Sequence, residues 1–121
     1  MQIRSVIVEP VRISTAEAEL RVIVELDGPA DGIELRGRLV GPRRDGVSTV
    51  EVAYPLRSGG MSAAGHILRA IIPEPNLWSP AAPFRYDGRV EVWDIGGRVD
   101  SHAFAGELRP AAGGGITRTS T

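Results

Sequence analysis

The sequence predicts an all-β fold, a two-layered sandwich, from three observations. Apolar and polar residues alternate with a period of two over several segments, so each segment turns one face to a core. Clusters of turn-forming Gly, Pro, Asp and Asn separate these segments about every ten residues. Fifteen glycines and nine prolines stand among short apolar runs, and this composition favours strands over helices.

The length and the composition limit the chain to one domain. The 121 residues leave room for one hydrophobic core, which at this size buries roughly 65% of the surface of the unfolded chain. There is no cysteine, so neither a disulfide nor a thiolate metal site can stabilise the domain. We expect a sandwich domain over residues 1–109 and a flexible Gly/Ala/Thr-rich tail or linker over residues 110–121.

The charge pattern argues against partners that are polyanions or membranes. The net charge is -1, and the basic residues, all of them Arg, are interleaved with fifteen carboxylates, unlike the basic patch of a nucleic-acid-binding protein. No apolar run has the length of a transmembrane helix, and the N-terminal residues lack the pattern of a secretory signal peptide. We therefore expect a cytoplasmic protein by default, or a secreted one if this segment belongs to a larger protein.

The first three predicted strands lie in the N-terminal third of the chain. Residues 3–13 are β-branched and interrupted at Pro10, which is typical of an edge strand that passes from one sheet to the other. Residues 17–27 show the clearest alternation, with one apolar face. Residues 33–39 alternate apolar with charged side chains, and the turn cluster at 41–46 ends this strand.

Two more strands are predicted in the middle of the chain. Residues 47–56 alternate and are followed by a flexible glycine-containing loop at 57–60. The inward positions of this fourth strand are Val50, Val52, Tyr54 and Leu56. Residues 66–72 have apolar side chains on both faces, so we expect either a strand covered on both sides or one whose outer Ile67 and Ile71 contact something else.

A proline-rich corner follows the fifth strand. Proline fixes φ and lacks a backbone donor, so residues 73–83 can form neither a helix nor a central strand. Leu77 and Trp78 are too large and apolar to remain in water, so we expect the corner to fold them onto one end of the core. The prolines of the corner are Pro73, Pro75, Pro80 and Pro83.

Two strands joined by a tight hairpin complete the predicted sandwich. Residues 84–93 alternate, with Tyr86 directed inward and Trp93 outward. Residues 94–97 predict a tight turn, and residues 98–108 return as the last strand. The total of about seven antiparallel strands is that of an immunoglobulin-like sandwich.

The corner also resembles a known family. Residues 75–86, P-N-L-W-S-P-A-A-P-F-R-Y, are similar to the N-P-x-L-W-S-P-x-x-P-x-L-Y signature that closes the immunoglobulin-like sandwich of glycoside hydrolase family 2, the β-galactosidase and β-glucuronidase group. Glu74 and Arg85 differ from the signature, which often has Asn and Leu there. Downstream, residues 90–109 resemble the last strands of the same domain, with one extra residue before Arg109.

The resemblance implies a non-catalytic domain. In the family this sandwich bridges a sugar-binding jelly roll and a catalytic α/β barrel, and the two catalytic glutamates lie on the barrel. None of the nine glutamates of this sequence therefore inherits a catalytic role. We expect no enzyme activity and no cofactor, but a scaffold or interaction module whose partner is a glycosidase catalytic domain or another protein domain. The residues that resemble the family's structural corner are Leu77, Trp78, Pro80, Pro83 and Tyr86, the last of them similar to a corner tyrosine.

The residues themselves supply no catalytic or metal-binding constellation. His66 and His102 are the two histidines, and a metal site would need carboxylates at no recognisable spacing, so we expect both to be solvated or locally hydrogen-bonded. No G-x-S-x-G motif places a serine nucleophile. Several glutamates lie on outward positions beside arginines, where we expect cross-strand pairs on solvated sheet faces. They are Glu19, Glu25, Glu34, Glu51 and Glu91.

Three large apolar side chains point out of the predicted core: Ile67, Ile71 and Trp93. They are consistent with a modest, partly polar interface with another domain. Trp93 has two interpretations: it covers part of its own domain, favoured because no second aromatic residue shares its face, or it is exposed for stacking on a sugar. Two alternative functions follow, a stand-alone carbohydrate-binding module that uses Trp93 and an adhesion-type sandwich that associates through its edge strands.

Overall fold

The chain folds as a sandwich of two antiparallel sheets, which confirms the predicted all-β class. The computed structural model describes residues 2–29 and 31–109, so the predicted tail at 110–121 lies outside the described residues. The described residues form no helix, and hence none long and apolar enough to cross a membrane. The strands are β1 (Ile3–Ile13), β2 (Glu17–Leu26), β3 (Glu34–Arg43), β4 (Val52–Pro55), β5 (Arg57–Ser62), β6 (Gly65–Pro73), β7 (Arg85–Asp94) and β8 (Gly97–Gly106).

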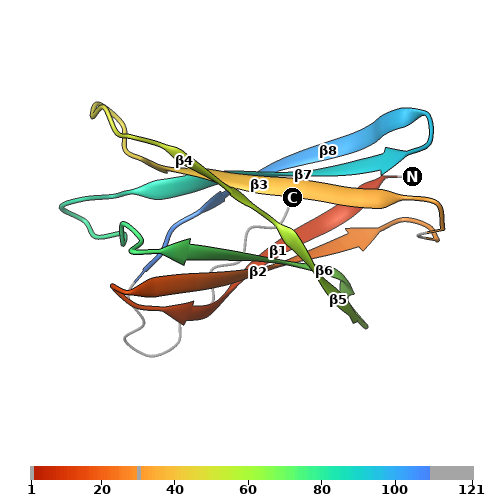
Figure 1. The fold of residues 1–121 in the computed structure, drawn as a ribbon, viewed down its shortest axis with the longest axis horizontal. Coiled ribbons are helices and arrows are strands. Elements are labelled where there is room, and N and C mark those ends of the chain that lie inside the picture. The colour runs from red at the N-terminus through yellow and green to blue at the C-terminus, as the bar shows by residue number, and fades with distance from the viewer. Residues whose placement is uncertain (1, 30, 110–121) are drawn as a thin grey trace.

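The strands divide into two layers of four. The first sheet has the order β1-β2-β6-β5 and the second sheet the order β4-β3-β7-β8, and Figure 1 shows them stacked face to face. The predicted hairpin joins β7 to β8, with Asp94 paired to Gly97. Each sheet therefore has two central strands, β2 and β6 in the first and β3 and β7 in the second.

The β1 and β3 strands differ from the prediction. β1 stays in the first sheet along β2, so the predicted change of sheet at Pro10 is wrong; the ladder instead shifts its register between Pro10 and Arg12. A proline in an edge strand removes no necessary ladder bond, so a local irregularity suffices. β3 runs on to Arg43 because its pairing with β7 continues there. The turn predicted at 41–46 is therefore shorter, at residues 45–46, between the bridged Arg44 and Val47.

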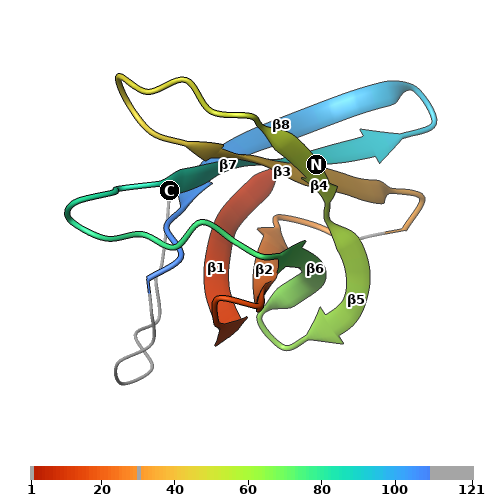
Figure 2. The same ribbon diagram turned by 60° about the vertical axis from the view of Figure 1, so that its left-hand side comes forward.

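The eighth strand arises where the sequence predicts one strand at 47–56 and a loop at 57–60. β4 occupies only the end of the first segment, and β5 occupies the predicted loop. Between them the buried Leu56 donates its N–H to the carbonyl of Gly37 at 2.9 Å. Here the chain crosses from the second sheet to the first, as both views show (Figure 1, Figure 2). The loop prediction is wrong because ladder hydrogen bonds hold β5 in the sheet although all its side chains are exposed.

The prediction of inward positions for residues 47–56 is right only near Leu56, where the chain passes from the second sheet to the first. Leu56 is buried and Tyr54 packs partly buried against the core, whereas Val50 and Val52 are 88% and 46% exposed. Val50 precedes β4, so no ladder fixes which way its side chain points, and Val52 begins an edge strand. The inward prediction for these two valines is therefore wrong.

The core lies between the facing sides of the two sheets. Burial of each of its large apolar side chains contributes about 1.5–3 kcal/mol relative to exposure. The apolar face predicted for residues 17–27 and the inward positions predicted for residues 84–93 supply much of it. Its buried members are Val6, Val8, Ala18, Leu20, Val22, Val24, Leu39, Leu56, Leu68, Ala70, Ile72, Tyr86, Val90, Phe104 and Leu108.

Glycines in the second sheet make room for the largest core side chains. A Cβ added to Gly41 would lie 2.6 Å from a ring carbon of Tyr86, and one added to Gly88 would overlap the ring of Phe104. Gly88 and Phe104 face each other directly across β7 and β8. The aromatic rings thus fill the space that these glycines leave on the inner face, which seals the second sheet against the core.

Candidate functional site

Tyr86 and Leu77 hold the proline-rich corner to the core. Tyr86 is 1% exposed, and its hydroxyl oxygen accepts a hydrogen bond from the backbone N–H of Asn76 at 3.0 Å. Burial raises the pKa of Tyr86 because a phenolate there would lose its hydration. Leu77 is partly buried against the core cluster. The neutral tyrosine therefore links β7 to the corner across one end of the sandwich.

Trp78 joins the corner to the segment after β8. The backbone N–H of Trp78 donates to the carbonyl of Leu108 at 2.8 Å. The guanidinium of Arg109 lies 3.9 Å from the centroid of the Trp78 ring. The indole is half-buried, whereas Pro80 and Pro83 are exposed. The corner thus closes this end of the sandwich and leaves little of the indole free.

Trp93 lies on the outer face of the second sheet and is engaged within its own domain. The Arg36 guanidinium lies 4.3 Å from the centroid of its ring, and the indole N–H donates to Glu91 at 3.2 Å. Glu91 also accepts a hydrogen bond from Arg98 at 3.1 Å. These two hydrogen bonds, that of Trp93 first, lower the pKa of Glu91. The half-buried indole therefore offers a sugar ring no free stacking face on the side of Arg36.

Ile67 and Ile71 lie on the outer face of the first sheet. Ile67 pairs with Ile23, which pairs in turn with Ile7 on the edge strand. Ile23 is only 7% exposed although it lies outside the core cluster, so these three isoleucines cover one another in a short strip. Ile71 lies apart from the strip, opposite Glu19, and is 52% exposed.

A buried carboxylate on the outer face of the first sheet is surrounded by arginines. Glu19 is 6% exposed, and its carboxylate accepts hydrogen bonds from Arg69 at 2.6 Å and Arg12 at 3.3 Å. All five glutamates predicted at outward positions lie within ion-pair distance of an arginine. The pairs are Glu19 with Arg69, Glu25 with Arg4, Glu34 with Arg36, Glu51 with Arg43 and Glu91 with Arg98.

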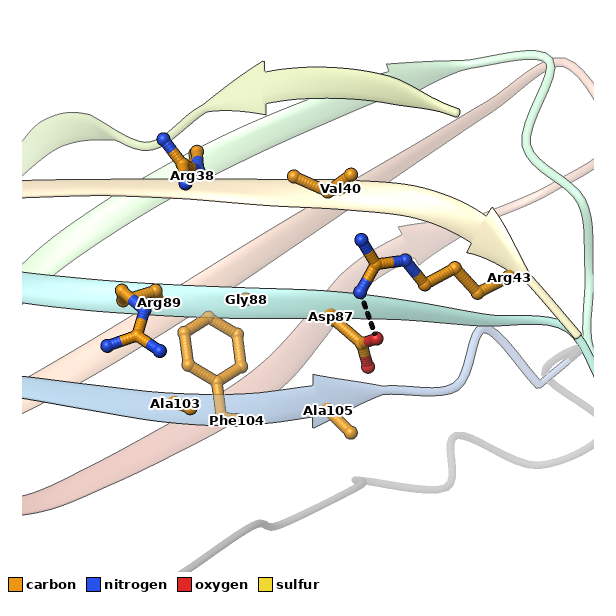
Figure 3. Close-up of a pocket in the computed structure, with 9 residues that line it drawn as sticks. All are labelled: Arg38, Val40, Arg43, Asp87, Gly88, Arg89, Ala103, Phe104 and Ala105. Carbon is orange, nitrogen blue, oxygen red and sulfur yellow. Dashed lines mark hydrogen bonds and ion pairs between the residues drawn. The ribbon is translucent and has the colours of Figure 1, made fainter. Parts of the chain in front are cut away.

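A shallow hollow of about 560 Å³ lies on the outer face of the second sheet. Its base consists of small side chains from β3 and β8, and charged side chains stand around it (Figure 3). The Phe104 ring lies behind β7, on the core side. The residues that line the hollow are Arg38, Val40, Arg43, Asp87, Gly88, Arg89, Ala103, Phe104 and Ala105.

Two arginines stand directly opposite each other at one end of this hollow. Arg38 of β3 pairs in register with Arg89 of β7, and Arg89 donates a hydrogen bond to Ser101 at 3.1 Å. Within the described part of the chain, no ion pair joins either arginine to a carboxylate. The sequence places Arg38 and Arg89 on outer faces by alternation, but only the register between β3 and β7 shows that they meet.

The described residues form no metal-binding group. They contain no group of three or more His, Asp or Glu side chains that could hold a metal ion. His66 lies on β6 of the first sheet and His102 on β8 of the second. The buried Nε2 of His102 has no hydrogen-bond partner among the described residues.

Comparison with known proteins shows a likeness of structure. The sequence matches no protein-family model and no curated protein. Among solved structures, a β-glucuronidase from Bifidobacterium dentium, complexed with coumarin-3-O-glucuronide, contains a similar fold, with a TM-score of 0.62 and 19% sequence identity. The likeness covers 88% of this chain but 18% of the chain of the enzyme. The chain therefore has the fold of a small part of that enzyme.

Proposed function

We propose that this chain is a non-catalytic, immunoglobulin-like module related to the sandwich domain of glycoside hydrolase family 2, and that it acts as a scaffold against another protein domain. The strand order supports the immunoglobulin-like assignment. The first sheet has the A-B-E-D order of such domains, and β3-β7-β8 corresponds to C-F-G with β4 as an added edge strand. The corner tyrosine and the Leu-Trp-Ser-Pro segment support the relation to the family.

The observation that carries the proposal is that the structural match covers most of this chain but a small part of the enzyme. Nearly the whole of this chain, 88%, corresponds to 18% of a β-glucuronidase chain, so the enzyme contains much besides this fold. A catalytic α/β barrel needs about 250 residues, more than the 121 residues of this chain. A module of this kind contributes position and contact surface, and its partner contributes the chemistry.

The two-layered body suits a scaffold. Its core is continuous between the sheets, and the corner is tied at one end through Tyr86 and Trp78. Such a body holds its outer faces in a fixed geometry without help from a disulfide. The surfaces available to a partner are then the outer faces of the sheets, and we propose a glycosidase catalytic domain or a similar protein domain as that partner.

A glycosidase assay on the purified chain tests the non-catalytic assignment. The chain is incubated with aryl β-glucuronides and aryl β-galactosides, beside a mock preparation from the same host without the gene. We expect release of the aryl alcohol to equal that of the mock preparation. Turnover that co-elutes with the chain through successive purification steps would overturn the proposal.

A further inference from the structure

We propose that Arg38 and Arg89 bind a carboxylate carried by an acidic segment of a partner protein. The site is the hollow on the outer face of the second sheet, and the inference rests on the proposed function as an interaction module. Four features carry it: the register of the two arginines, the engagement of the carboxylates nearby, the shape of the hollow and the chemistry of the guanidinium group.

The register places two like charges directly opposite each other in the middle of the sheet. Arg38 and Arg89 are paired on the two central strands, β3 and β7. Side chains at directly opposite positions have Cβ atoms about 4.5–5.5 Å apart, and like charges there destabilise a sheet. A carboxylate bound between them would convert this repulsion into two attractions.

The carboxylates nearby are engaged with other partners. Asp87 accepts a hydrogen bond from Arg43 at 2.7 Å and lies 3.3 Å from the Arg85 guanidinium. Glu91 is held by hydrogen bonds from Trp93 and Arg98, and the attraction of the Arg38 charge lowers its pKa less than these hydrogen bonds do. The arginine pair therefore retains unused donors that face solvent, since Arg89 makes one side-chain hydrogen bond, to Ser101.

The hollow favours a side chain of a protein over a sugar. Its base is formed by Val40, Ala103 and Ala105, which are small enough to let an Asp or Glu side chain reach the guanidinium groups. The aromatic ring at its lining, Phe104, is 5% exposed and turned to the core, so the hollow has no aromatic platform for a sugar ring. An extended acidic segment crossing the face would fit an open hollow of this kind.

The chemistry of the pair suits a carboxylate. A carboxylate has two oxygens with about four acceptor positions, so it can accept hydrogen bonds from two guanidinium groups at once. Guanidinium groups are also weakly hydrated, which lowers the cost of covering them with a partner. The pair thus provides both the charge and the directed donors that recognition of an acidic side chain needs.

Titration with a labelled peptide tests the proposal. The probe alternates Glu with Ser and is compared with the same peptide carrying Gln for Glu, by fluorescence anisotropy at low ionic strength. We expect the Glu peptide to bind at least tenfold more tightly than the Gln peptide. R38Q and R89Q should each weaken binding about tenfold, because each removes charge-assisted hydrogen bonds, and added salt should weaken binding to the unaltered chain.

A matched variant separates this site from general attraction between charges. Arg57 is exposed on the edge strand β5 of the other sheet and, among the described residues, has no ion-pair partner; R57Q makes the same change of charge there. We expect R57Q to bind the Glu peptide as the unaltered chain does, and circular dichroism to show all three variants folded. Equal weakening by R57Q, or no effect of R38Q and R89Q, would overturn the site.

Two small anions test whether the partner is a protein. Glucuronate and inorganic phosphate are titrated as competitors, and we expect each to displace the peptide only at far higher concentrations than the unlabelled Glu peptide requires. Displacement by either at equal or lower concentration would overturn the assignment to a protein segment. Absence of peptide binding would overturn the carboxylate site, while the glycosidase assay would still test the non-catalytic role independently.

Discussion

Each sheet carries one pair of arginines facing each other across its two central strands, and the two pairs differ in their counter-charges. In the first sheet Arg21 faces Arg69, and each lies near a carboxylate, Glu9 at 4.0 Å and Glu19 at 2.6 Å. In the second sheet Arg38 faces Arg89, and in the described part of the chain neither forms an ion pair.

The two outer faces therefore differ in how far their central arginines are compensated. The first sheet surrounds Glu19 with Arg12 and Arg69, so its central arginine pair has counter-charges within the free chain. We expect the uncompensated arginine pair of the second sheet to lower the stability of the free chain. Such a cost is expected where a surface is built for contact and not for the stability of the isolated domain.

The largest loss of unfolding free energy is expected when the packing of the second sheet is disturbed. This sheet carries Arg38 and Arg89, which we call the open arginine pair because neither forms an ion pair within the described residues. Gly88→Ala places a methyl group against the Phe104 ring, and overpacking of this kind costs about 1–3 kcal/mol of unfolding free energy. Urea denaturation measures the loss. Gly96→Ala is the control, because Gly96 lies in the exposed turn between β7 and β8 and an added Cβ there meets only the Asp94 side chain, at 3.3 Å. An unfolding free energy unchanged by Gly88→Ala would contradict the packing of Phe104 under β7.

The next largest loss of unfolding free energy is expected when Glu19, the counter-charge of Arg69 in the first sheet, is made neutral. Glu19→Gln removes the buried carboxylate that binds Arg69 and Arg12, and we expect a loss of about 1–2 kcal/mol, because hydrogen bonds to charged groups are strong but both arginines are half-exposed. The exposed pair of Glu25 and Arg4, 3.5 Å apart, gives the control: Glu25→Gln should cost less than about 0.5 kcal/mol. Equal losses in the two variants would show that Glu19 has no special role.

A small gain in unfolding free energy is expected when one arginine of the open arginine pair, Arg38 and Arg89, is made neutral. Arg38→Gln relieves the repulsion between Arg38 and Arg89, so we expect the unfolding free energy to rise by up to about 0.5 kcal/mol at low salt. The gain should shrink as salt screens the repulsion. Paired urea curves at two ionic strengths measure it. A clear loss of stability in Arg38→Gln would mean that the arginine is already compensated in the free chain.

The smallest effect expected is on how the stability of the chain falls with pH, through Glu91 on the outer face of the second sheet. The pKa of Glu91 is lowered from its usual 4.5 by the hydrogen bonds of Trp93 and Arg98. Because its folded-state pKa lies below its unfolded one, its contribution is present above that usual value and is lost as the pH falls through the folded-state pKa. Glu91→Gln should therefore flatten the loss of stability in this acidic range, as thermal melts between neutral and acidic pH would show. An unchanged pH profile would contradict this role.

Alternation in the sequence predicts the sandwich well where both faces of a strand have clear environments. β2, β6 and β7 lie where the sequence places them, and the outward glutamates meet arginines as expected. The prediction is wrong where backbone pairing acts without burial, as in β5, or where alternation continues past the end of a ladder, as at Val50. A strand can pair through its backbone whatever its side chains expose, so the hydrophobic pattern does not show it.

The open arginine pair is a property of register. Alternation predicts that Arg38 and Arg89 point outward, but which residues stand opposite depends on how β3 and β7 slide past each other. Turns fix the register of hairpin neighbours, whereas β3 and β7 are separated by β4, β5, β6 and the corner. The sequence therefore predicts a charged outer face without showing which of its charges remain uncompensated.

Nuclear magnetic resonance of the arginine side chains tests most directly whether the two pairs differ. The labelled chain is titrated with the Glu peptide while the Nε–H signals of all arginines are followed. We expect the signals of Arg38 and Arg89 to shift together and saturate, with those of Arg21 and Arg69 unmoved. Equal shifts at both pairs, or none at Arg38 and Arg89, would contradict the account.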